Sequence, residues 1–297
     1  IGALIFANIV QAIAFAFSRP ANKAIITELV EKDELVLYNS RLELVLQVVS
    51  VSSPVLSFLV LQFASLHLTL LLDALTFFIA FVLVALLPKE EPMVQDKKPF
   101  TGKDIFADIK DGLHYIWHQK EIFFLLLVAS SVNFFFAAFE FLLPFSNKLY
   151  GVEGAYATIL TMGAIGSIIG ALIANKFKSS MNTLLFLLIL TGVGVFMMGL
   201  PLPNILAFSG NLICELFMTI FNIHFFTRVQ TKVESEFLGR VLSTIFTLAI
   251  LFMPIAKGFM TVLPSVHLSS FLIIGSGVII LSCISFIYVR THFEKLI

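Results

Sequence analysis

Nine long apolar runs constrain this chain more than any other feature of its sequence. Each holds roughly 20 mostly apolar residues, which is the length that an α-helix needs to cross the hydrocarbon core of a bilayer. Transmembrane β-strands are about half as long and alternate polar with apolar side chains, and the runs lack that pattern. The sequence therefore predicts an all-α polytopic membrane protein with nine transmembrane helices. The runs cover residues 1–17, 41–63, 67–88, 121–146, 156–176, 182–200, 204–227, 239–263 and 270–289.

The composition indicates a lipid environment and gives no sign of enzymatic chemistry. The 297 residues are 59% hydrophobic and 13% charged, with a mean hydropathy of +1.00. The six histidines have no metal-ligand spacing, and the two cysteines, Cys214 and Cys283, fall in separate runs. No nucleophile or phosphate-binding motif occurs. We therefore predict that the chain is not an enzyme, needs no cofactor or metal, and binds no nucleic acid.

The distribution of Lys and Arg predicts how the chain crosses the membrane. Alternate loops hold nearly all of these residues, whereas the opposite set of loops holds only Lys148. Because loops rich in Lys and Arg stay on the cytoplasmic side, we expect a multi-pass protein of the cell membrane with a cytoplasmic C-terminus. The chain opens at Ile1, already inside an apolar run. We therefore expect a fragment that lacks its N-terminal part.

One long polar segment, residues 88–120, divides the predicted helices into a group of three and a group of six. Its second half places Ile105, Ile109, Leu113 and Ile116 on one helical face. That spacing predicts an amphipathic helix on the inner membrane surface. We expect three regions: a three-helix region (1–87), a cytoplasmic linker (88–120) and a six-helix region (121–297).

Two stretches carry a resemblance to a known family. The first is "RPANKAIITELVEKDELVLYNS" at residues 19–40, with "LLLDALTFFIAFVLVALLP" after it, and the second is "VQTKVESEFLGRVLSTIFTLAILFMPI" at residues 229–255. In these the chain resembles drug-efflux members of the major facilitator superfamily, particularly the macrolide-efflux type of Gram-positive bacteria. The resemblance covers nearly the whole chain. It implies the major facilitator fold, twelve helices in two halves, of which this chain holds the fourth to the twelfth.

The same resemblance implies a function. It predicts a monomeric secondary active transporter that exports amphipathic, macrolide-like small molecules by alternating access, driven by protons. Two positions depart from the family pattern. Gln11 stands where many proton-coupled relatives carry an arginine, and the Gly-Pro pair of the fifth helix is reduced to Ser53 and Pro54. These departures leave the coupling site open, although Gln11 still offers hydrogen bonds to a substrate.

Three further residues are candidates for gating or structural roles. Gly166 and Gly170 recur at a spacing of four, which lets another helix approach closely. Such a face is either ordinary packing or a surface on which the two halves move. Arg240 belongs to the second stretch that carries the resemblance.

Ionisable residues inside the apolar runs are functional candidates, because a charge in hydrocarbon costs several kcal/mol. Glu215 lies near the midpoint of its run, and Asn211 and Asn222 fall close to the same helical face. A polar stripe of this kind is typical of a helix beside a water-filled cavity. We expect Glu215 to bind a substrate cation or a proton, with an interhelical hydrogen bond as the alternative. The four candidates are Asp73, Glu140, Glu215 and Lys257.

Glu140 and Lys257 are expected to form an ion pair. Each lies about 10 Å from the midpoint of its run, toward the outer surface, at 1.5 Å per residue. Asn133, seven residues before Glu140, continues the same polar face. The pair could be fixed and buried, could open as a gate, or could titrate with protons; alternatively, Lys257 extends alone to the outer surface. Asp73, near the outer end of its run, is expected to be structural.

Two other interpretations of the function stay open. A siderophore or metabolite exporter of the same superfamily would have nearly the same sequence pattern. A non-transporting remnant of a truncated gene would also fit the expected loss of helices. In every case the chain contacts the lipid bilayer. As an exporter of drugs, siderophores or metabolites, its other partners are a small-molecule substrate and protons.

Overall fold

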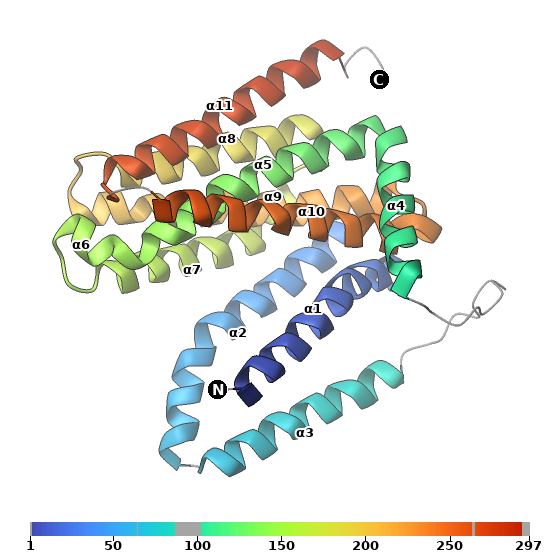
Figure 1. The fold of residues 1–297 in the computed structure, drawn as a ribbon. Helices are drawn as coiled ribbons and strands as arrows, with labels where there is room; N and C mark the ends of the chain where they lie inside the picture. Colours follow the sequence, from blue (N-terminus) through green and yellow to red (C-terminus); the bar gives the residue numbers. More distant parts are fainter. Residues whose placement is uncertain (1, 64, 87–101, 263–264, 293–297) are drawn as a thin grey trace.

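The structure is a computed structural model, and it describes residues 2–63, 65–86, 102–262 and 265–292. Within these ranges the chain is helical and contains no β-strand (Figure 1). The elements are α1 (Gly2–Leu29), α2 (Leu35–Phe63), α3 (Leu66–Ala85), α4 (Gly102–His118), α5 (Lys120–Leu142), η1 (Leu143–Phe145), α6 (Ser146–Tyr150), α7 (Ala155–Ile173), η2 (Ala174–Lys176), α8 (Met181–Met198), α9 (Asn204–Lys232), α10 (Ser235–Val262) and α11 (Ser269–His292).

The all-helical membrane fold predicted from the apolar runs is confirmed. Every predicted run coincides with one long helix: α1, α2, α3, α5, α7, α8, α9, α10 and α11. Among the described residues, seven helices are long and apolar enough to cross a membrane on length and composition alone, so the count of nine is approximate. Residues 88–101 of the predicted linker lie outside the described part of the chain, and α4 follows them.

Capping serines and a glycine mark the ends of several helices. The hydroxyl of Ser180 accepts a hydrogen bond of 3.1 Å from the backbone N–H of Thr183 and caps the start of α8. Ser65 caps α3 in the same way, through the N–H of Leu68. Both satisfy a backbone donor that has no partner inside the helix. Gly151 ends α6 with a φ of 66°, a left-handed conformation that favours glycine.

Helices α5 and α7–α11 form one bundle, and glycines bring several of them close together. α7 packs on α9, α8 packs on α9 and α11, and α5 packs on α10 and α11. A Cβ atom at Gly166 would collide with the carbonyl oxygen of Leu212, and one at Gly170 with that of Leu216. The expected packing face of Gly166 and Gly170 is therefore confirmed, since only glycine lets α7 lie this close to α9.

Replacing Gly166 with valine is expected to loosen this contact. The new side chain would push α7 away from α9, and overpacking of this kind lowers the free energy of unfolding by about 1–3 kcal/mol. The measurement is the midpoint of thermal or denaturant unfolding in detergent. Gly258→Val is the matched control, because no atom lies within 4 Å of a Cβ placed at Gly258 in α10. Equal losses in the two variants would contradict the packing explanation.

The first three helices lie against one side of this bundle. α1 packs on α10 and α9, and α2 packs on α7, α9 and η2. Figure 1 shows α1 and α2 approaching the bundle at the end where α9 turns into α10, and diverging from α7 toward the opposite end. α3 packs on α2, and nearly all of its described side chains are exposed, as expected of a helix that faces lipid. The two helix groups therefore meet mainly at one end.

Candidate functional site

The predicted ion pair between α5 and α10 is present. Nζ of Lys257 lies 3.2 Å from Oε2 of Glu140. The two side chains are 46% and 51% exposed, so the pair lies on the surface of the bundle and is not enclosed by it. In this structure Lys257 is therefore paired with Glu140, and the bundle encloses neither side chain. At membrane depth each charge lowers the cost of the other, so separating the pair would leave each charge without its partner.

Glu215 faces α7 from the middle of α9. The Ser167 hydroxyl donates a hydrogen bond of 3.4 Å to Oε2 of Glu215. Asn211 is 2% exposed, and its amide donates a hydrogen bond of 2.8 Å to the backbone carbonyl of Ile159. Both side chains contact the space above Gly163, where a Cβ atom would collide with Asn211. The expectation that the stripe faces a water-filled cavity is thus wrong for Asn211, because its amide binds the backbone of α7.

The remaining predicted residues lie apart from this cluster. Asn133 on α5 and Asn222 on α9 are half-buried, and Gln11 on α1 and Asp73 on α3 are exposed. Pro54 lies within α2, and its side chain is outside what the structure describes. Arg240 on α10 is half-buried, and its guanidinium carbon lies 5.9 Å from the ring centre of Phe237.

A buried polar network joins the two helix groups at the end where they meet. Asn39, at the start of α2, donates from Nδ2 to Oε1 of Gln230 (2.7 Å) and to Oγ1 of Thr227 (3.1 Å), both on α9. Nε2 of Gln230 in turn donates to the backbone carbonyl of Lys23 on α1 (2.7 Å). Asn39, Thr227 and Gln230 are at most 3% exposed. We call these four residues the inner network.

Lys23 and Glu43 extend this polar region away from the inner network. The Lys23 ammonium lies 4.7 Å from the ring centre of Phe226 on α9. Lys23 follows the predicted span 1–17; burial lowers the pKa of its ammonium, and the negative charge of Glu43 opposes that shift. Glu43 on α2 is half-buried and accepts a hydrogen bond of 2.9 Å from Gln47, one turn away. A carboxylate and an ammonium thus lie near the junction of α1, α2 and α9.

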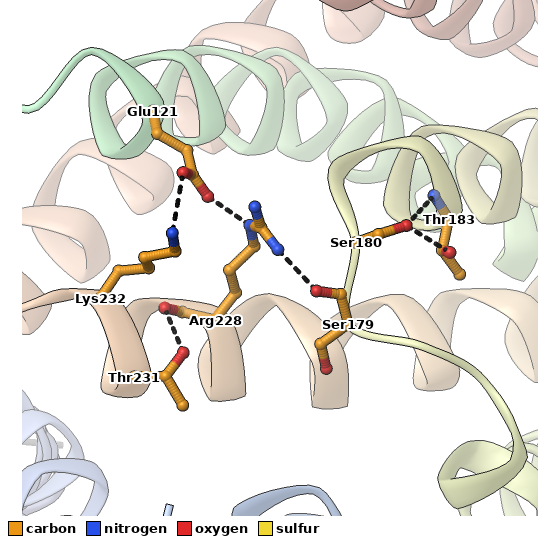
Figure 2. Close-up of polar contacts among 7 residues, drawn as sticks. All are labelled: Glu121, Ser179, Ser180, Thr183, Arg228, Thr231 and Lys232. Carbon is orange, nitrogen blue, oxygen red and sulfur yellow. Dashed lines mark hydrogen bonds and ion pairs between the residues drawn. The ribbon is translucent and has the colours of Figure 1, made fainter. Parts of the chain in front are cut away.

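A second polar cluster joins helices of the larger bundle to one another at this end, as Figure 2 shows. Arg228 of α9 pairs with Glu121 at the start of α5, and Lys232 lies 3.6 Å from the other carboxylate oxygen. Nη1 of Arg228 also donates to the backbone carbonyl of Ser179, before α8 (2.5 Å). One arginine therefore holds three helices together at their ends.

His224 adds a further tie one turn before Arg228. The imidazole is fully buried and bonds the backbone carbonyl of Ala174 in η2 at 2.9 Å and the hydroxyl of Ser179 at 2.5 Å. When Nε2 donates to the carbonyl, Nδ1 accepts from the hydroxyl. These contacts hold the η2 turn on α9, so His224 has a structural role.

Comparison with known proteins agrees with this architecture. The family model described as "Major Facilitator Superfamily" matches residues 1–254. The chain belongs to the Major Facilitator Superfamily. It is therefore a multi-pass membrane protein of a transporter family and not an enzyme, and a small molecule is its expected substrate. No solved structure matches the chain.

Two curated relatives of this superfamily member share a name. "Macrolide efflux protein A" of Enterococcus faecalis is 28% identical over 263 residues, which cover 83% of this chain and 78% of the relative. The protein of the same name from Streptococcus pyogenes is 28% identical over 262 residues, 83% of this chain and 62% of the relative. These similarities support the resemblance to the drug-efflux type of the superfamily that the sequence shows.

Sequence reasoning missed the inner network of this superfamily member. Asn39 falls just before the predicted run 41–63, and Gln230 just after the run 204–227, so the predicted spans exclude both. Glu43 lies inside the run 41–63, at its edge, and was not counted among the ionisable residues. The signal that could have found these residues is their position. Two amides and one carboxylate lie at the ends of predicted spans, where neighbouring helices can contact one another near the membrane surface.

Proposed function

We propose that this chain acts in the export of amphipathic, macrolide-like small molecules as a secondary active transporter. The observation that carries the proposal is the arrangement of its two helix groups. They are joined at one end by the inner network and diverge toward the other end (Figure 1). Such an arrangement suits a protein in which two groups of helices rock about a site between them. The substrate class is taken from the relatives, both of which are named "Macrolide efflux protein A".

The inner network indicates which end of the transporter is closed in this structure. Its end of the bundle carries the loops with Lys32, Lys178 and Lys232, and Lys and Arg mark cytoplasmic loops. We infer that this end is cytoplasmic and closed, that the substrate site opens to the outside, and that the C-terminus is cytoplasmic. For the substrate to enter from the cytoplasm, the bonds of Asn39 and Gln230 must break.

Proton coupling is assigned to the carboxylates on the helices of the larger bundle. Glu215 has a hydrogen bond of 3.4 Å from Ser167, and Glu140 has one cation, Lys257, on an accessible surface. A carboxylate with a weak or separable partner can bind a proton when the local environment changes. We propose that at least one of these groups is protonated and deprotonated during the cycle, in a protein that acts as a monomer.

Export itself is tested in cells that express this chain and lack other macrolide exporters. We expect lower accumulation of radiolabelled erythromycin than in cells with the empty vector, and we expect a protonophore to remove the difference. Equal accumulation, with the chain present in the membrane, would favour a non-transporting remnant. Export of siderophores or metabolites without export of the macrolide would favour the other exporter class.

The ion pair is tested by a double-mutant cycle. Glu140→Gln is expected to lower transport, because it leaves the Lys257 ammonium without its partner at membrane depth. Adding Lys257→Gln removes the unpaired charge, so the double variant is expected to recover part of the loss. The measurement is the initial rate of erythromycin efflux in the four proteins. Independent losses that simply add would contradict a functional pair.

A further inference from the structure

A cavity lies outside the polar regions described above, where the linker helix crosses the bundle. It has a volume of about 630 Å³ and is lined by α4, α5 and α10. This volume is in the range of small-ligand sites, about 300–1,000 Å³. Gly112 lets α4 lie on α10 here, because a Cβ at this position would contact the carbonyl oxygen of Arg240 at 2.8 Å. Tyr115 of α4 stacks on Phe237 of α10 at 4.8 Å and holds the crossing.

The cavity is charged at one end and mostly apolar along the rest of its length. Lys110, Asp111 and His114 of α4 line the first part. Leucine and phenylalanine side chains from α5 and α10, including Leu127 and Phe252, line most of the remainder, together with Ser130 and Ser131 of α5. A small molecule that fits this lining has a polar head and a long apolar body.

The depth of the cavity matches one leaflet of a bilayer. Ser131 of α5 lines it about 15 Å beyond the start of the predicted span at residue 121, at 1.5 Å per residue. Leu248 of α10 lines it about 14 Å beyond residue 239, by the same arithmetic. Phe252 of α10 lies about 20 Å beyond residue 239 on the same basis. The hydrocarbon core is about 30 Å thick, so half of it is about 15 Å. The apolar part therefore spans one leaflet and reaches about 5 Å past the bilayer midplane at Phe252, with α4 at the level of the lipid head groups.

We propose that this cavity binds a zwitterionic phospholipid of the adjacent leaflet, with its head group at α4 and one acyl chain between α5 and α10. The neighbouring charges of Lys110 and Asp111 complement a head group that carries both a phosphate and an ammonium. Their charges cancel, so they give no preference for a net anionic lipid. Trp117, which also lines the cavity, is 69% exposed and suits the interface between head groups and chains.

The single tryptophan of the chain makes this proposal measurable. Trp117 is the only tryptophan among the 297 residues, so all tryptophan fluorescence reports on this cavity. Bromine atoms on an acyl chain quench tryptophan on contact. The purified chain in dodecyl maltoside is titrated with phosphatidylcholine, phosphatidylglycerol or diacylglycerol that all carry the same brominated chains. We expect saturable quenching by phosphatidylcholine, with half-saturation at a concentration about fivefold lower than for the other two.

Three variants distinguish specific binding in the cavity from general contact with lipid. Ser131→Phe fills the far end of the cavity and is expected to abolish saturable quenching. Ile284→Phe on α11 is the matched control, because Ile284 is exposed and does not line the cavity. Asp111→Asn removes the partner of the ammonium and is expected to remove the preference for phosphatidylcholine over phosphatidylglycerol.

Quenching that does not saturate, or that is the same for all three lipids, overturns the proposal and indicates contact with surrounding lipid only. Unchanged quenching in Ser131→Phe overturns it as well. The comparison of head groups uses the unmodified chain, so it decides the question even where a variant does not fold. The test does not involve transport, and its outcome is independent of the proposed export.

Discussion

Under the proposed proton coupling, replacing Glu215 with glutamine is expected to lower export by about tenfold or more, within the range of coupling free energies of 1–3 kcal/mol. Glutamine keeps the size of the side chain and can still accept a hydrogen bond from Ser167, but it cannot bind or release a proton. Glu215 faces α7 from the middle of α9, where the Ser167 hydroxyl donates a hydrogen bond of 3.4 Å to it. The measurement is erythromycin efflux driven by an imposed pH gradient in membrane vesicles.

Two controls distinguish coupling from structure. Glu153→Gln removes a carboxylate from an exposed position before α7, and its efflux is expected to stay at the unmodified level. The thermal midpoint of Glu215→Gln in detergent is expected to stay near that of the unmodified chain, because the packing against Gly163 is kept. Lost efflux together with a lowered midpoint would instead support the interhelical hydrogen bond as the role of Glu215.

The features that depend on position along one helix were predictable from the sequence. Apolar runs fix which segments become helices, because the bilayer sets their length. The pairing of Glu140 with Lys257 followed from counting residues, since equal depth on two helices brings opposite charges to one level. The spacing of Gly166 and Gly170 likewise predicted a close contact, and α9 provides it.

The features that depend on which helices become neighbours were not predictable in this way. Asn39 and Gln230 are separated by 191 residues, and no local pattern relates them. Arg228 follows the run 204–227 and Glu121 begins the run 121–146; they are separated by 107 residues, and no local pattern relates them either. Asn211 was placed correctly on the face of Glu215, but that face lies against α7. The sequence pattern gives the polar side of a helix and leaves open whether water or another helix covers it.

This distinction separates two kinds of polar residue in the chain. Arg228 and His224 bind backbone carbonyls within the larger bundle, so their bonds persist when whole helix groups move. Asn39 and Gln230 bind across the two groups, so their bonds exist only while the groups are together. Loss of the first kind is expected to destabilise the fold, whereas loss of the second kind is expected to shift a conformational equilibrium.

Gln230→Leu is therefore expected to favour separation of the two helix groups at the inner network. The variant leaves the Lys23 carbonyl without its donor and Asn39 without its closer acceptor. An unsatisfied buried polar group costs about 1–3 kcal/mol. Separation of the helix groups exposes these atoms to water and removes this cost. The separated state therefore becomes more stable relative to the joined state. The measurement is the distance between spin labels at Lys32→Cys and Lys178→Cys, with Cys214 and Cys283 replaced by alanine; we expect a larger fraction of long distances.

A double-mutant cycle of Asn39→Leu and Gln230→Leu tests whether the two residues act together. Asn39→Leu alone is expected to shift the distances in the same direction as Gln230→Leu. The double variant is expected to shift them by less than the sum, because two leucines at these positions contact each other and leave fewer unpaired polar atoms. Thr231→Val is the control, since the Thr231 hydroxyl bonds the carbonyl of Arg228 within α9 and does not reach the other helix group. Unchanged distances in Gln230→Leu, or the same shift in Thr231→Val, would contradict a gate at the inner network.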